Sequence, residues 1–176
     1  MMRILTSLML LLTGGIAIGQ KVIANEIAQL QSSGQQLHEA SILGFTSNEV
    51  QNRAFNLDGL SKGAILTIDS DGIQQLITGQ RANDFVKVKI PISARSSLTL
   101  ILKQHEIFTG DFTLFTSDNP SVPADYTPGL HYKGVVEGDP SSIVAVSVFN
   151  DQVMALISSD LGNAVIGPIK GDRENR

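Results

Sequence analysis

The chain has 176 residues, which is enough for one domain. Its formal net charge of −4 argues against a nucleic-acid binder, and no run of basic residues indicates an anionic membrane surface. There is no Cys, which excludes disulfides, thiolate zinc sites and cysteine nucleophiles.

Residues 1–19 have the pattern of a secretory signal peptide. Met1-Met2-Arg3 is a short positive segment, residues 4–12 are mostly apolar, and Ala17-Ile18-Gly19 places small residues before a cleavage site that we expect after Gly19. The apolar run is well short of the roughly 20 residues that a membrane span needs, so an anchor is the weaker interpretation. We therefore predict a secreted or periplasmic protein with no membrane contact after signal cleavage.

Residues 20–60 form a leader with little signal. Ile23, Ile27 and Leu30 have helical spacing, which fits a short amphipathic helix that ends near Ser32-Ser33-Gly34. The Gln and Ser content of the same stretch fits a flexible leader equally well, and the spacing does not decide between the two.

Residues 61–169 have the pattern of one β domain. Residues 64–68 and 73–77 flank Asp69-Ser70-Asp71-Gly72, and Asp-Gly between apolar runs predicts a hairpin. The alternative is a calcium loop. It starts with suitable spacing, but no acidic residue follows in the slots that would complete the coordination sphere.

The later strands are expected from runs of apolar and β-branched residues between turn residues. Residues 143–149 are apolar on both faces, which predicts a central strand covered on both sides of its sheet. Residues 117–129 hold three prolines and no periodicity, so we expect a loop or crossover there, and residues 170–176 read as a charged linker or tail. The expected strands are 85–92, 98–108, 112–116, 130–137, 143–149, 153–157 and 164–169. The predicted fold is mostly β: a single antiparallel β sandwich or barrel-like sheet of about eight strands.

No complete catalytic motif is present in the sequence. Of the three His residues, His105 is followed by Glu106, but the second His of a zinc-protease helix is absent. There is no Gly-x-Ser-x-Gly elbow and no phosphate-binding loop. Spacing alone leaves a Ser-His-Asp triad open, because triads assemble from distant positions. Glu137 and Asp139 flank a glycine and are more typical of a turn than of an acid/base pair.

Residues 131–147, HYKGVVEGDPSSIVAVS, resemble the signature of prodomains of reprolysin/ADAM-type zinc metalloproteases. That signature has an aromatic-x-Gly strand, a Gly-acidic-x-x-Ser turn and an alternating apolar strand that ends in Ser. Residues 153–157 and Gly162-Asn163 are similar to the family's next strand and turn, and the likeness covers roughly 85–169. It is closest to secreted bacterial members. The positions that carry it are His131, Tyr132, Gly134, Gly138, Asp139, Ser142, Ser147 and Gly162.

The resemblance implies a propeptide that acts as a folding aid or latency module for a metalloprotease catalytic domain, in cis in a precursor or in trans. The zinc is then expected in the catalytic domain, with no cofactor in this chain and no catalysis by it. Because the chain lacks the cysteine that often caps the zinc in animal relatives, inhibition would be steric. The candidate processing sites are Gly19, Lys170, Arg173 and Arg176. Two alternatives remain: a free-standing exported β module for adhesion or ligand binding, and a hydrolase in which Ser, His and an acid converge.

Overall fold

The computed structural model describes residues 18–46, 63–79, 85–93 and 95–168. The chain divides into two units, Met1–Gln35 and Gln36–Arg176, and each is described by itself. The apolar part of the predicted signal peptide, residues 4–12, lies outside the described residues, as do the candidate processing residues 170, 173 and 176.

The first unit contains one helix, α1 (Ile18–Ser32), among its described residues. Gly34 follows it with φ of 69°, and the Ser32 hydroxyl donates to the carbonyl of Gln29 at 2.8 Å. A left-handed glycine just beyond a helix is a common C-terminal cap. Of the two alternatives left open for the leader, the structure has the helix over residues 18–32, and it ends at the Ser-Ser-Gly segment that was the expected end of such a helix. Gly19 lies in the first turn of α1. Neither helix in the described ranges has the length and apolar content needed to cross a membrane.

The second unit is built on a seven-stranded sheet with the order β1-β4-β5-β6-β7-β8-β9. From β4 to β9 every neighbouring pair is antiparallel, whereas β1 runs parallel to β4. A separate two-stranded sheet pairs β2 with β3. The strands are β1 (His38–Ala40), β2 (Leu43–Phe45), β3 (Leu66–Ile68), β4 (Phe85–Ser93), β5 (Ser96–Gln104), β6 (Leu130–Val136), β7 (Asp139–Val148), β8 (Val153–Ser159) and β9 (Gly162–Ile166).

The domain is thus mostly β, as expected, but its main sheet is open. β1 and β9 lie at the two ends of the strand order and do not pair with each other, so the described strands do not form a barrel. The short strands β1 and β2 lie in the leader, where no strand is predicted from the sequence.

The predicted strand at 73–77 is wrong, because these residues belong to the helix α3 (Ser70–Gly79). Asp69 caps this helix: its carboxylate accepts a hydrogen bond from the Gly72 amide at 3.0 Å. Ile73 and Leu76 are both fully buried, at the three-residue spacing of a helical face. The Asp-Ser-Asp-Gly segment that suggested a hairpin turn is therefore a helix start.

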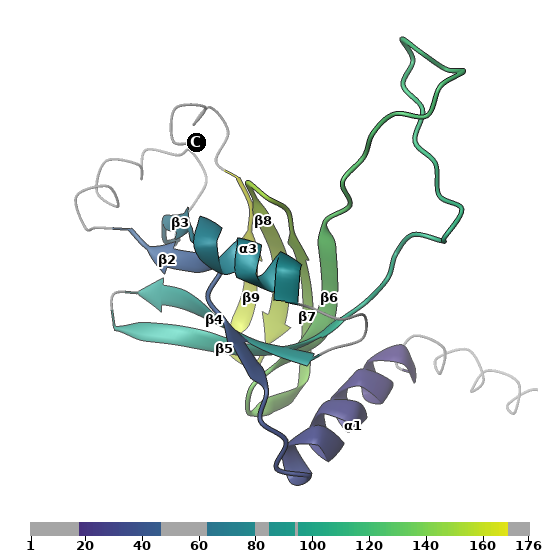
Figure 1. Cartoon of the computed structure of the whole chain (residues 1–176). Helices are drawn as coiled ribbons and strands as arrows, with labels where there is room; N and C mark the ends of the chain where they lie inside the picture. The colour runs from purple at the N-terminus through teal and green to yellow at the C-terminus, as the bar shows by residue number, and fades with distance from the viewer. Residues whose placement is uncertain (1–17, 47–62, 80–84, 94, 169–176) are drawn as a thin grey trace, which may run out of the picture. The chain divides into compact units, whose positions relative to one another are not determined.

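One face of the main sheet forms the core beneath α3, which lies across it (Figure 1). Alternate residues of β4, β7 and β8 point into this core, as the period of a strand requires. In β7 these are Val144, Val146 and Val148, each at most 2% exposed. The other buried sheet residues of this cluster are Ala40, Val86, Val88, Ile90, Leu100, Leu102, Tyr132, Val136, Val153, Ala155 and Ile157.

The opposite face of the sheet, called here the outer face, is open over β7 to β9. The expectation that β7 is covered on both sides is wrong, because Ile143 on its outer face is 48% exposed. Met154, Leu156 and Val165 continue this exposed apolar strip onto β8 and β9, where Leu156 and Val165 pair directly. Apolar residues on both faces of a strand therefore do not mark a doubly covered strand here.

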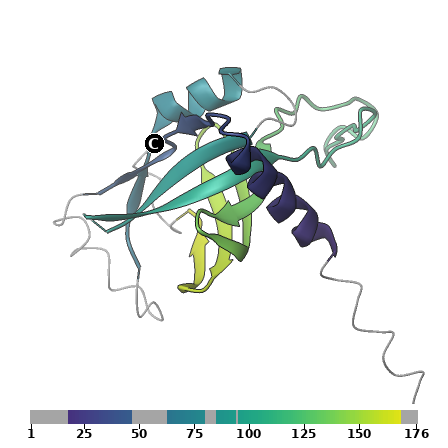
Figure 2. The ribbon, with the colours of Figure 1, turned by 90° about the horizontal axis from the view of Figure 1, so that it is seen from below.

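A long connection, residues 105–129, joins β5 to β6. It projects away from the sheet in both views of the ribbon (Figures 1 and 2). The strand expected at 98–108 ends earlier, at Gln104, and the strand expected at 112–116 is not formed. Instead, the connection folds back on itself: the Ala124 amide donates to the Leu114 carbonyl at 2.8 Å, and Thr116 bridges Asn119. The loop expected at 117–129 is confirmed and is longer than predicted.

Candidate functional site

The turn between β6 and β7 is held by the signature residues of the sequence. Gly138 has φ of 85°, a conformation that other residues adopt only at a cost. Ser142 is 2% exposed; its hydroxyl accepts from the Val136 amide at 2.7 Å and donates to the Asp139 carbonyl at 2.5 Å. One buried hydroxyl thus bonds to both strands at the point where their register shifts.

The carboxylate of Asp139 ties two turns together. One oxygen accepts from the amide and the hydroxyl of Ser141, at 3.1 and 2.6 Å, and the other accepts from the amide of Asp160 at 3.0 Å. The hydrogen bond from the Ser141 hydroxyl and the bond from the Asp160 amide lower the pKa of Asp139. Gly162, with φ of 110°, lies in the same β8–β9 turn as Asp160. The interpretation of Asp139 as a turn residue fits this geometry.

The first glycine of the signature, Gly134, is required because the neighbouring strand leaves no space for a side chain. A Cβ added to Gly134 would lie 2.0 Å from the carbonyl oxygen of Ile101 on the neighbouring strand β5. Tyr132, two residues earlier, is 2% exposed in the core, and burial raises its pKa. These two signature positions therefore serve the packing of β6 and present no reactive group to solvent.

His131 and Ser147 form a cross-strand pair at the other end of the β6–β7 hairpin. They are direct partners in the register, and the His131 Nδ1 and Ser147 Oγ atoms lie 2.9 Å apart. The His131 Nε2 atom is buried and has no hydrogen-bond partner among the described residues. A catalytic triad needs both imidazole nitrogens, one for the nucleophile and one for an orienting acid. The pair lacks that acid, and the alternative of a hydrolase gains no support from it.

His131 is also the inner member of an aromatic cluster that anchors the long connection. The rings of Phe108 and Phe149 lie edge-on to its imidazole, with centroids 6.1 and 5.9 Å away. Phe112 and Tyr126 extend the cluster outward, and both contact Phe108, at 4.3 and 5.7 Å. Edge-to-face rings at such distances attract one another beyond their burial. The amide of His105 donates to the His131 carbonyl at 2.8 Å and fixes the base of the same segment.

Residues 105–129 combine exposed apolar side chains with acidic ones, and we call them the acidic–apolar loop. In the described part of the chain, six of the fourteen exposed large apolar side chains lie in it. Four acidic residues accompany them, and no Lys or Arg occurs between Lys103 and Lys133. The six apolar residues are Ile107, Phe112, Leu114, Phe115, Val122 and Tyr126; the four acidic residues are Glu106, Asp111, Asp118 and Asp125.

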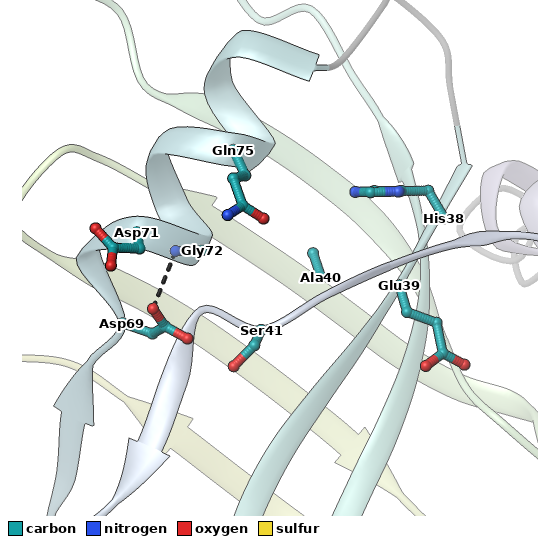
Figure 3. A pocket seen from close by; sticks show the side chains of 8 residues that line it. All are labelled: His38, Glu39, Ala40, Ser41, Asp69, Asp71, Gly72 and Gln75. Atoms are coloured by element: carbon teal, nitrogen blue, oxygen red, sulfur yellow. Dashed lines mark hydrogen bonds between the residues drawn. The ribbon is translucent and has the colours of Figure 1, made fainter.

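A polar hollow of about 300 Å³ lies between α3 and the segment that runs through β1 (Figure 3). Asp69, one of its acids, is engaged as the helix cap, and hydrogen bonds from the Gly72 amide and the Ser41 hydroxyl lower its pKa. His38 and Glu39 are exposed at the other side of the hollow. Its full lining is His38, Glu39, Ala40, Ser41, Asp69, Asp71, Gly72 and Gln75. Within the described ranges, no three His, Asp or Glu residues are grouped so that they could hold a metal ion.

No protein-family model, no curated protein and no solved structure matches this chain. The residues singled out in the sequence do meet in space, but as two separate groups: the turn group of Gly138, Asp139 and Ser142, and the His131–Ser147 pair. The sequence does not indicate the acidic–apolar loop as a site, because the pattern of residues 112–116 predicts a strand. Its sequence signal is the absence of cations over a stretch that holds three Phe and one Tyr.

Proposed function

We propose that this chain is the propeptide region of a secreted reprolysin-like zinc metalloprotease and acts by contact with the catalytic domain. The observation that carries the proposal is the gathering of exposed apolar side chains on the acidic–apolar loop. Large exposed apolar patches are uncommon on proteins that have no partner. The resemblance of residues 131–147 to metalloprotease prodomains gives the partner its identity.

The signature residues support the proposal through their structural tasks. Close approach of the neighbouring strand requires a glycine at Gly134, and the positive φ favours one at Gly138. Burial of its hydroxyl between the two strands favours a small residue at Ser142. They build the hairpin from which the loop is held, because His131 at its other end packs against Phe108. In this proposal the sheet is a frame, and the loop is the part that meets the enzyme.

The mechanism needs no reactive group in this chain. A propeptide that binds the folded catalytic domain stabilises it by mass action, by about 2.7 kcal/mol at a concentration 100 times the Kd. Covalent linkage in a precursor raises the effective concentration further. Without a cysteine to bind the zinc, latency comes from steric cover of the substrate cleft.

Refolding a catalytic domain in the presence of this chain tests the proposal. We expect denatured catalytic domains of secreted bacterial reprolysin-like proteases to recover in higher yield with the purified chain than with an equal amount of albumin. Folded enzyme should lose peptide hydrolysis as the chain is titrated in. The proposal is wrong if neither the yield nor the activity changes with any such domain.

The second candidate function is an exported β module for adhesion or ligand binding. The exposed strip formed by Ile143, Met154, Leu156 and Val165 on the outer face favours it, since this strip lies on the regular sheet and not on the loop. Under this alternative, Leu156→Ser abolishes binding of the chain to its target, and variants of the loop do not.

A further inference from the structure

We propose that the acidic–apolar loop docks into a groove that has an apolar floor and a rim of Lys and Arg side chains. This inference rests on the proposed function, and it specifies the chemistry of the surface that the propeptide meets. It follows from the charge of the loop, from its exposed side chains and from the contacts that hold its shape.

The charge of the loop is the first step. Residues 105–129 contain four acidic side chains, all of them exposed, and no Lys or Arg. A hydrogen bond from the Thr109 hydroxyl lowers the pKa of Asp111, so this carboxylate stays ionised in mildly acidic solution. A surface of one sign is complementary to a partner surface of the opposite sign, and that match speeds encounter and rejects wrong partners.

The apolar side chains are the second step. Phe115 and Val122 are 50% and 54% exposed, and they lie outside the group of rings packed around Phe108. Phe112 and Tyr126 belong to that group yet remain 45% and 42% exposed, so each also presents an open side to a partner. Aromatic anchors that fill pockets supply much of the energy of protein interfaces. An apolar floor bordered by cations would match this mixture of side chains.

The shape of the loop is the third step. Its base is fixed by the His105–His131 backbone bond, and its two legs are joined by the Ala124–Leu114 bond. A loop already folded before it binds loses less conformational entropy on binding. Projecting loops insert into concave surfaces more readily than they cover flat ones. A groove is therefore the partner shape that fits.

Four of the described Lys side chains gather on the main sheet, away from the loop. Lys87, Lys89, Lys103 and Lys133 lie together on the outer face of β4 to β6, and Lys87 pairs with Glu137 at 2.8 Å. They leave the loop itself uniformly acidic. A partner groove with a basic rim would thus distinguish the loop from the sheet face of the same molecule.

Two loop variants and two controls test the inference on the full chain. The charge variant combines Asp111→Asn, Asp118→Asn and Asp125→Asn, and the apolar variant combines Phe115→Ser and Val122→Ser. The controls are Asp151→Asn and Ile92→Ser, which change an exposed acid and an exposed apolar residue outside the loop. Circular dichroism and thermal unfolding check that every variant folds like the original chain.

The first readout is inhibition of a reprolysin-like catalytic domain. We expect both loop variants to weaken inhibition at least about tenfold and both controls to leave it unchanged; a few exposed contacts suffice for this, since about 1.4 kcal/mol is tenfold. If the original chain inhibits and the loop variants inhibit equally well, docking by the loop is wrong while the propeptide function stands.

The second readout does not depend on a protease. Two amphipathic helical peptides of about five turns are compared, one of Leu and Lys and one of Leu and Glu. We expect the chain to bind the Leu/Lys peptide at least about tenfold more tightly, with an advantage that shrinks as salt screens the charges and that the charge variant lacks. Equal binding of the two peptides overturns the inference. If the chain prefers the Leu/Lys peptide but affects no catalytic domain, the docking chemistry is supported and the propeptide function is wrong.

Discussion

At the scale of single residues, His131 has the most demanding surroundings among the signature positions. Its Nδ1 atom is engaged with Ser147, whereas its Nε2 atom is buried beside the Phe108 and Phe149 rings without a hydrogen-bond partner in the described structure. A protonated imidazole carries an N–H on both nitrogens, so its Nε2–H would be a buried donor without an acceptor, which is costly. Neutral His131 is therefore the form that the fold accepts.

This gives a pH dependence with a definite sign. Burial lowers the pKa of His131 below its ordinary value of 6.5, so the unfolded chain takes up a proton at this site first as the pH falls. Stability should decrease as the pH falls below about 6.5, because the unfolded state then binds more protons than the folded one. We expect the free energy of unfolding in urea to fall between pH 7.5 and 5.5.

Replacement of the three histidines separates this effect from other titrations. His131→Phe should flatten the dependence between pH 7.5 and 5.5, and His38→Gln and His105→Gln, at exposed positions, are the control variants. Asp69 and Asp139 have lowered pKa values. The stability that their ionised carboxylates contribute is therefore lost only at a more acidic pH, where they become protonated. An identical slope in the original chain and in His131→Phe would show that this imidazole is not the group responsible.

At the scale of elements, α3 shows why short apolar segments mislead. Ile73, Leu76 and Ile77 fit a helical face, but Ile73, Gln75 and Ile77 also alternate like a strand. Asp and Gly serve both as hairpin residues and as residues of a helix start, so the local signal does not decide. The decision comes from the sheet, whose core face buries Ile73 and Leu76 together.

Two substitutions distinguish the helix from the strand. Leu76 is fully buried, and we expect Leu76→Ala to cost about 2–5 kcal/mol of unfolding free energy through lost burial and a cavity. Gln75 is exposed, and Gln75→Ala should change stability by about 0.5 kcal/mol or less. A strand would place Gln75 with the two isoleucines, so the reverse order of the two effects in urea titrations would refute the helix.

The strands of the signature region were better determined by the sequence than α3 was. Residues 130–157 predicted three antiparallel strands, and β6, β7 and β8 occupy these positions, because alternation and turn residues agree there over several strands in succession. Whether other residues cover the outer face of β7 could not be predicted, because an apolar residue such as Ile143 occurs on covered and on open sheet faces alike. The His131–Ser147 pair was equally hidden, because two residues sixteen apart meet only through the register.

At the scale of the whole second unit, the core of the sheet and the acidic–apolar loop are made of separate residues. The main core cluster of described residues includes no residue from 105–129, so the loop adds little to the core. We expect replacement of residues 106–129 by Gly-Asn-Gly to change the unfolding free energy by about 1 kcal/mol or less, since loop-closure entropy varies slowly with length.

Under the proposed function, the same replacement should abolish inhibition of a reprolysin-like catalytic domain. Urea titration and a peptide-hydrolysis assay can measure both effects on one sample. Keeping His105 and Leu130 preserves the backbone bond at the base of the loop and the first residue of β6. A shortened chain that no longer folds would show that the loop belongs to the core after all. A shortened chain that folds and still inhibits would show that the sheet, and not the loop, contacts the catalytic domain.

The cation-free stretch between Lys103 and Lys133 has a further consequence for resistance to proteolysis. Long exposed loops are where digestion usually begins. Trypsin-like enzymes, however, cut after Lys or Arg, which an aspartate in their specificity pocket selects. The loop offers them no bond to cut, whereas chymotrypsin-like enzymes find Phe112, Phe115 and Tyr126 exposed. The lifetime of the loop would then depend on which class of protease the protein meets.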